Sequence, residues 1–183
     1  MLDTLGAGGF IDVARAVGAL NIRSGEIIAD LGCGTGHFAI TLAKATGPSG
    51  MVYAVDVQTG PLESVQARAE DLNISNIETI HADIEVPNST GLADSTVSFS
   101  LFVNVLFQST NRSAMIAEGV RILRPKGRVA IIDWKKGTQG FGPEDNHRMT
   151  ESEVKTLLIG AGLKNEEPIS VGEYSFGFIA TKA

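Results

Sequence analysis

The sequence lacks the features that disulfide-rich, zinc-binding and membrane-spanning proteins require. Its 183 residues contain a single cysteine, Cys33, which excludes an internal disulfide and any multi-cysteine zinc or iron–sulfur site. No apolar run approaches the roughly 20 residues of a transmembrane helix. The N-terminus has neither the basic segment nor the long apolar segment of a signal peptide. We therefore expect a cytoplasmic protein with no metal and no membrane span.

Basic residues are also scarce. Lys and Arg together number 15 against 21 for Asp and Glu, so the net charge is −6. Because proteins that grip nucleic acid through its phosphates normally carry a basic face, nucleic acid is a disfavoured partner. With 43% hydrophobic and 20% charged residues, the composition is that of an ordinary globular chain, and we expect residues 1–183 to form one domain. The sequence does not indicate an oligomeric state.

Short apolar runs alternate with helical patterns along the chain. Strands are expected at 26–31, 51–56, 76–81, 97–102 and 128–133, and closing strands at 163–169 and 173–181. Helices are expected at about 9–20, 38–47, 61–72, 115–123 and 150–162, with a lid-like loop at 134–149. The continuous apolar strands indicate a parallel sheet with helices on both faces. The two closing strands, with no helix between them, predict an antiparallel hairpin at one edge.

A glycine-rich turn, residues 30–36 (DLGCGTG), joins the first strand of this pattern to a helix. Glycines let the backbone approach a ligand closely, and the N-terminus of the following helix offers free N–H groups. Asp56 ends the next strand 20 residues after Gly36, where an acid can bind ribose hydroxyls. The pattern predicts a site for a nucleotide-like cofactor; the alternative is a tight turn that only needs small residues.

Asp30 indicates which cofactor this is. A dinucleotide would place its pyrophosphate at the turn, where the carboxylate would repel it, whereas the sulfonium and ammonium of S-adenosylmethionine would be attracted. The third glycine also comes one residue earlier than in the G-x-G-x-x-G pattern of dinucleotide-binding proteins. The sequence therefore favours S-adenosylmethionine, and an NAD(P)-dependent oxidoreductase is the alternative.

Five segments, in order along nearly the whole chain, resemble the class I S-adenosylmethionine-dependent methyltransferases. Residues 30–36 match the first motif and residues 55–57 the second. Residues 81–84 resemble the segment whose acid contacts the adenine amino group, and residues 102–107 the segment whose backbone meets the methionyl end of the cofactor. Residues 122–127 resemble the turn before the fifth strand. The chain is most similar to small methyltransferases that resemble the ubiquinone/menaquinone C-methyltransferases.

This resemblance implies a Rossmann-like, doubly wound α/β sheet of seven strands in the order 3-2-1-4-5-7-6, with strand 7 antiparallel. It implies methyl transfer from S-adenosylmethionine by in-line displacement to a small-molecule acceptor, leaving S-adenosylhomocysteine, without a metal. Protein or RNA is the less favoured acceptor. Because displacement depends mainly on positioning, a non-catalytic S-adenosylmethionine-binding module is a further alternative. The residues expected to hold the cofactor are Asp30, Gly32, Cys33, Gly34, Gly36, Asp56, Val57, Ala82, Asp83, Ile84 and Asn104.

Several of these residues also have simpler interpretations. Asp83 is also suited to capping a loop, Asn104 to a turn at a strand end, and Cys33 to packing as a small buried residue. Two positions depart from the family pattern: Ser98 replaces the acid that usually opens the fourth strand, and Phe107 stands where relatives often carry histidine.

The acceptor side is expected after the fourth and fifth strands. Phe107, Trp134 and Phe141 are candidates to line it, and His147 is the candidate base if the acceptor must lose a proton. The alternative for the 134–149 loop, which also carries Glu144 and Arg148, is a solvated surface loop. Asn104 is not followed by the paired prolines of adenine amino-methyltransferases, and one cysteine cannot supply the three-cysteine chemistry of arsenite methyltransferases. The sequence does not identify the acceptor or the atom that is methylated.

Overall fold

The computed structural model describes residues 5–6, 11–138 and 140–183. The strands of the main sheet are β3 (Ile27–Leu31), β4 (Met51–Asp56), β5 (Ile77–His81), β6 (Val97–Val103), β7 (Leu123–Trp134), β8 (Leu163–Pro168) and β9 (Ser175–Lys182). The helices are α1 (Val13–Ala19), α2 (His37–Thr46), α3 (Thr59–Asp71), α4 (Arg112–Ile122) and α5 (Glu151–Gly160), with a 3₁₀ turn η2 (Leu106–Gln108). Two short strands, β1 (Leu5–Gly6) and β2 (Ile11–Asp12), pair separately.

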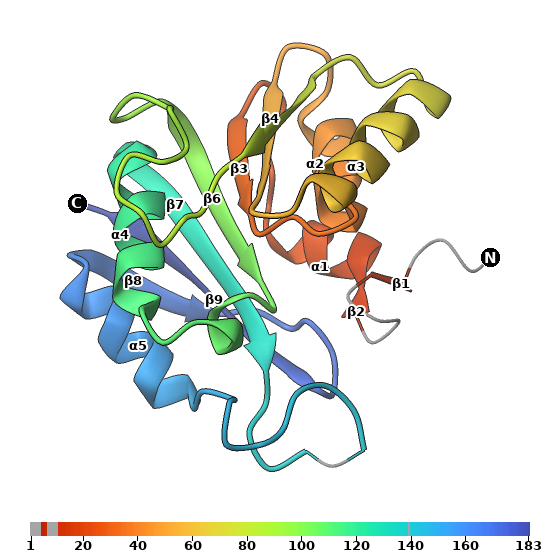
Figure 1. Ribbon diagram of the computed structural model, residues 1–183. Helices are drawn as coiled ribbons and strands as arrows, with labels where there is room; N and C mark the ends of the chain where they lie inside the picture. The colour runs from red at the N-terminus through yellow and green to blue at the C-terminus, as the bar shows by residue number, and fades with distance from the viewer. Residues whose placement is uncertain (1–4, 7–10, 139) are drawn as a thin grey trace.

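The main sheet has the order β5-β4-β3-β6-β7-β9-β8. Counted along the chain, this is 3-2-1-4-5-7-6, so the expected order is confirmed. Strands β3 to β7 are parallel, and β9 runs antiparallel to both β7 and β8. Helices α1, α2 and α3 lie on one side of the sheet and α4 and α5 on the other (Figure 1). The doubly wound, Rossmann-like architecture is therefore the observed one.

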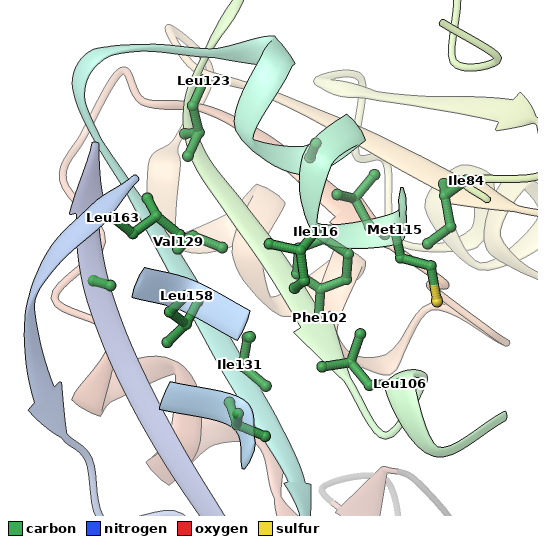
Figure 2. Packing of buried hydrophobic residues seen from close by; sticks show 14 of the residues in the cluster. Ile84, Phe102, Leu106, Met115, Ile116, Leu123, Val129, Ile131, Leu158 and Leu163 are labelled. Carbon is green, nitrogen blue, oxygen red and sulfur yellow. The ribbon is translucent and has the colours of Figure 1, made fainter. Parts of the chain in front are cut away.

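Each face of the sheet has its own buried cluster, because the strands are apolar on both sides. On the α4 and α5 side, Phe102 of β6 is packed among Ile116 and other aliphatic residues (Figure 2). Helix α4 comes close to the sheet at Gly119, where a Cβ atom would lie 2.6 Å from Cζ of Phe102. In the described part of the chain, no helix has the length and apolar character needed to cross a membrane.

The expected helix at 9–20 is wrong in its first part. Residues 9 and 10 lie outside the described residues, Ile11 and Asp12 form β2, and α1 spans only Val13–Ala19. The Asp12 carboxylate accepts the N–H of Arg15 at 3.0 Å and so caps the helix there.

The starts of two other elements also differ from expectation. Helix α3 begins two residues before Pro61, which the first turn of a helix accommodates. Strand β7 begins at Leu123 rather than at residue 128, with a register shift opposite Val97 and Phe99. At the other end, the capping box of Thr150 and Glu153 begins α5 as expected.

Candidate active site

A cavity of about 420 Å³ opens at the carboxyl ends of the central strands. Its wall is built by the glycine loop after β3, the end of β4, the start of the loop after β5 and the segment after β6. Strand β3 lies between β4 and β6, so the chain winds in opposite directions on its two sides. Ligands of open α/β sheets bind in the crevice at such a switch point.

The cavity gathers nearly all of the residues expected to hold a cofactor. The members of that set in its wall are Asp30, Gly32, Cys33, Gly34, Asp56, Val57, Ala82, Asp83, Ile84 and Asn104. Gly36 is outside the described lining. A Cβ atom on Gly36 would lie 2.6 Å from Cγ2 of Val65, so glycine there allows α2 and α3 to pack closely.

The other two glycines of the loop have different surroundings. Gly32 has a φ of +81°, and a Cβ atom on it would lie 2.6 Å from Cγ2 of Val105. Gly34 has a φ of +51°, and no described atom lies within 4 Å of its Cβ position. Because Gly34 also lines the cavity, its missing side chain leaves room for a ligand to approach the backbone.

Asp30 is buried, with 1% of its surface exposed. Among the described residues, its Oδ2 atom has no hydrogen-bond partner. Burial, reinforced by repulsion from Asp56, raises the pKa of Asp30 to about 7. A ligand cation beside this carboxylate would favour its ionised form.

Asp83 and Asn104 line the cavity, and each also has a structural role in its own loop. The Asp83 carboxylate accepts the Glu85 N–H at 2.9 Å, so it does cap the loop that it begins. Asn104 has a φ of +51°, which is typical of a residue at a turn. Within the described chain, neither polar atom of its side-chain amide has a hydrogen-bond partner. Both residues therefore fit their simpler interpretations and still face the cavity.

The wall is strongly acidic. Four carboxylates line it, from Asp30, Asp56, Asp83 and Glu85, and the described lining includes no lysine or arginine. Burial and then the carboxylates of Asp30 and Asp56 raise the pKa of the Cys33 thiol. A protonated thiol is a poor nucleophile, which agrees with the interpretation of Cys33 as a small packing residue in the wall. The described residues contain no group of three or more His, Cys, Asp and Glu side chains that could hold a metal.

The aromatic residues expected on the acceptor side are not brought to the cavity. Phe107, Trp134 and Phe141 are outside its described lining. Trp134 is buried, and later residues of the 134–149 loop pack against it. A Cβ atom on Gly142 would lie 2.7 Å from its ring. The ring of Phe141 meets that of Tyr174 edge-on, at 5.4 Å between centroids. A role for these three residues in acceptor binding stays a prediction.

His147 is exposed and also outside the described lining. Its N–H donates to the Glu144 carbonyl at 3.0 Å, and its own carbonyl accepts from Arg112 at 3.2 Å. These contacts fix the backbone of His147 and do not direct its imidazole toward the cavity. Its role as a base also stays a prediction.

Arg148 organises the 134–149 loop. Its guanidinium is buried and donates to the main-chain carbonyls of Lys135, Thr138, Phe141 and Pro143. It also lies 5.8 Å from the centroid of the Trp134 ring. The loop is thus folded around the guanidinium of Arg148, an arrangement that the polar sequence of the loop did not indicate.

The sequence did not predict four residues of the cavity wall. Val105, Gln108, Ser109 and Met115 line it beyond Asn104. Val105 already belongs to the segment 102–107 that resembles the methyltransferases, and Gln108 and Ser109 follow it directly. Extending this segment by two residues would have included them. Met115 carried no such signal, because its helical spacing is that of a core residue.

Comparisons with known proteins agree with this geometry. Residues 28–127 match the family model described as "Methyltransferase domain". The ubiquinone/menaquinone biosynthesis C-methyltransferase UbiE of Pseudomonas putida is 33% identical over 120 residues, which cover 64% of this chain and 45% of the relative. An uncharacterized 37.1 kDa protein in transposon TN4556 of Streptomyces fradiae is 36% identical over 147 residues, which cover 79% of this chain and 41% of that protein. The chain thus spans less than half the length of these two relatives.

A solved structure extends the likeness to the fold. The crystal structure of a SAM dependent methyltransferase from Aquifex aeolicus superimposes with a TM-score of 0.85 at 28% identity, covering 95% of this chain and 91% of that one. The family model covers more than half of the chain and includes the glycine loop, Asp56, Asp83 and Asn104. The chain therefore belongs to the methyltransferase domain family, within the class I methyltransferases that depend on S-adenosylmethionine.

Proposed function

We propose that this chain binds S-adenosylmethionine in the 420 Å³ cavity and directs transfer of its methyl group, by in-line displacement, to a small-molecule acceptor. The observation that carries the proposal is the charge of the wall, with four carboxylates and no described lysine or arginine. Such a wall attracts a sulfonium and an ammonium and repels the pyrophosphate of NAD(P). The oxidoreductase alternative is therefore disfavoured.

The residues in the wall fit this cofactor. The buried Oδ2 atom of Asp30, without a partner in the described chain, would gain one from the cationic methionyl end. The open space at Gly34 would admit the cofactor against the backbone. In the same proposal Asp56 accepts hydrogen bonds from the ribose hydroxyls, and Asp83 and Ile84 bound the adenine.

The chain's part in the reaction is mainly positioning. S-adenosylmethionine supplies an already activated methyl group, so holding donor and acceptor in line provides most of the catalysis. Val105 and Met115 give the wall after β6 an apolar surface, which suits an organic acceptor. A base is needed only where the acceptor must lose a proton. His147, the candidate that the sequence offers for this role, is outside the described wall of the cavity.

Two observations support a small-molecule acceptor: the name of a relative and the net charge of the chain. The name of the Pseudomonas putida relative refers to quinone biosynthesis, which supports a small aromatic or quinone-like acceptor for this chain. The net charge of −6 makes RNA the weaker candidate. A cytoplasmic location, expected from the single cysteine, is part of the same proposal.

The test has two stages. Calorimetric titration of the full chain with S-adenosylmethionine, S-adenosylhomocysteine and NAD is expected to give binding of the first two only. The chain is then incubated with S-adenosylmethionine and a panel of phenolic, quinol and amine acceptors, and formation of S-adenosylhomocysteine is measured. Binding of NAD alone would overturn the cofactor assignment. Tight S-adenosylmethionine binding without product from any acceptor would favour a non-catalytic binding module.

A further inference from the structure

The loop between β5 and β6 is fastened to helix α4 by a buried carboxylate. Glu118 of α4 has 2% of its surface exposed. Its Oε2 atom accepts the N–H of Asn88 at 3.0 Å, and its Oε1 atom accepts the hydroxyl of Thr90 at 2.7 Å. A helix on one face of the sheet therefore holds the middle of a loop whose beginning lines the cavity.

Arg121 completes the attachment. Its guanidinium donates to both carboxylate oxygens of Glu118 at 2.8 Å and to Oδ1 of Asp94 at 2.7 Å. Burial by itself raises the pKa of Glu118, but hydrogen bonds from Arg121, Thr90 and the Asn88 amide lower it to about 2. Glu118 is therefore ionised at neutral pH, and its charge-assisted hydrogen bonds are of the stronger kind.

A short path of hydrogen bonds leads from this attachment to the cavity. Ser89 lies between the two residues that Glu118 holds, and its hydroxyl donates to the Asp83 carbonyl at 2.6 Å. The N–H of Val86 donates to the same carbonyl at 3.0 Å. Nearby, Ile84 belongs to the same buried cluster as Met115 of α4 (Figure 2). The backbone of Asp83 is thus hydrogen-bonded to Ser89, the residue between the two that Glu118 holds.

We propose that Glu118 is a positioning residue for the adenine end of the cofactor, acting through Asn88 and Thr90 to hold Asp83 in the cavity wall. The inference rests on the proposed function, which assigns adenine to Asp83 and Ile84. Glu118 is outside the described lining of the cavity, so it acts only through the loop.

A second buried ion pair provides a matched control. Glu26 has 8% of its surface exposed and accepts from Arg128 at 3.0 Å. Glu26 immediately precedes β3. Arg128 of β7 pairs with Phe99 of β6, which pairs in turn with Ile28 near the start of β3. The ion pair therefore lies away from the carboxyl ends of the strands, where the cavity opens. Its loss is expected to destabilise the fold without altering recognition of adenine.

The experiment compares two ligands that differ at the adenine amino group. S-adenosylhomocysteine and S-inosylhomocysteine, in which an oxygen replaces that amino group, are titrated calorimetrically into the wild-type chain and into E118Q, T90V and E26Q. A good hydrogen bond from the amino group predicts a wild-type preference of ~10-fold for the adenosyl ligand. We expect E118Q and T90V to reduce this preference to below ~3-fold, because Asp83 is no longer held in place.

The controls separate positioning from stability. E26Q is expected to lower the melting temperature while keeping the wild-type preference. T90V leaves the pairing of Glu118 with Arg121 intact, so it keeps the test open if E118Q does not fold. An unchanged preference in T90V and in folded E118Q overturns the inference, as does a wild-type chain that binds both ligands equally. A wild-type chain that binds neither S-adenosylmethionine nor S-adenosylhomocysteine overturns the proposed function instead.

Discussion

The N–H of Gly34 donates a hydrogen bond of 2.9 Å to Oδ2 of Asp56, which fastens the glycine loop after β3 to the acid that ends β4. The other oxygen, Oδ1, accepts the N–H of Gln58 at 3.0 Å. A carboxylate oxygen accepts more than one hydrogen bond, so both atoms remain able to bind a hydroxyl. One side chain thus shapes the loop and still presents its acceptors to the cavity.

We predict that Asp56→Ala weakens S-adenosylmethionine binding by at least ~10-fold, because hydrogen bonds to a charged group are worth ~1.5–3 kcal/mol each. Isothermal titration calorimetry measures the change. Asp71→Ala, at an exposed acid at the end of α3, is the control and should bind as the wild type does. Unchanged affinity in Asp56→Ala would contradict the ribose assignment.

Gly34 tests the close approach of the cofactor to the backbone. A side chain at this position would occupy cavity space that no described atom fills. We predict that Gly34→Val abolishes binding and that Gly34→Ala weakens it at least ~10-fold, with a conformational penalty of about 1 kcal/mol from the positive φ. Binding is followed by calorimetry and folding by thermal denaturation monitored by circular dichroism.

Two other glycines serve as controls for that experiment. Gly60→Ala, in the first turn of α3 with no described atom within 4 Å of its Cβ position, should change neither property. Gly36→Ala should lower the melting temperature more than Gly34→Ala does, because its Cβ would collide with Val65. Normal cofactor binding by Gly34→Val would show that the glycine loop does not contact the cofactor.

The sheet could be predicted because its signals are local. Strands β3 and β4 are short runs of mainly apolar residues, and the turn of residues 30–36 and Asp56 mark their ends. Strand β5 is more polar, with the sequence IETIH. The beginning of α1 could not be predicted in the same way. The helical spacing of Phe10, Val13, Val17 and Leu20 predicts a helix that includes residue 11, yet Ile11 pairs with Gly6 in a small separate sheet. Apolar periodicity does not distinguish such a short strand from an extra helical turn.

The acceptor side was harder to predict because its contacts join distant parts of the chain. Phe141 and Trp134 follow the end of a strand, which placed them near the crevice by topology alone. Their actual neighbours are Tyr174, from the segment before β9, and Arg148, from the far end of the same loop. No local pattern indicates that a buried guanidinium will collect the carbonyls of its own loop.

Asp30 should make cofactor binding depend on pH. With its pKa raised from 3.8 to about 7, the carboxyl is protonated below neutrality in the free chain. A cation binds the ionised form better, so binding expels the proton, and affinity for S-adenosylmethionine should fall by up to ~10-fold per pH unit below about 7. S-adenosylhomocysteine, which lacks the sulfonium charge, should show a shallower dependence. Calorimetry over about three pH units centred on neutrality measures both slopes.

The pH dependence of the stability of the free chain gives an independent check. Its sign is opposite to that of cofactor affinity, because the contribution of Asp30 to stability falls as pH rises. A native pKa above the unfolded value means that the folded state binds more protons, so this carboxyl contributes less to the free energy of unfolding as pH rises from about 4 to about 7. Asp30→Asn should flatten this trend in thermal melts and should weaken S-adenosylmethionine more than S-adenosylhomocysteine. Equal losses for the two ligands would mean that Asp30 contacts the ammonium or only braces the loop.

His147 gives the last prediction, on the acceptor side. Its side chain is exposed, its backbone is held by Glu144 and Arg112, and it is not part of the described cavity wall. We therefore expect His147→Ala to keep the wild-type affinity for S-adenosylmethionine and the wild-type dependence of kcat/KM on pH, measured with an acceptor that the panel has confirmed. Asp30→Asn is the contrasting variant, because its loss of a titrating carboxyl should reduce the fall in kcat/KM on the acid side. A selective loss of turnover in His147→Ala below the pKa of the acceptor would instead identify His147 as the base. Matching profiles in His147→Ala and wild type would leave an enzyme that works by positioning alone.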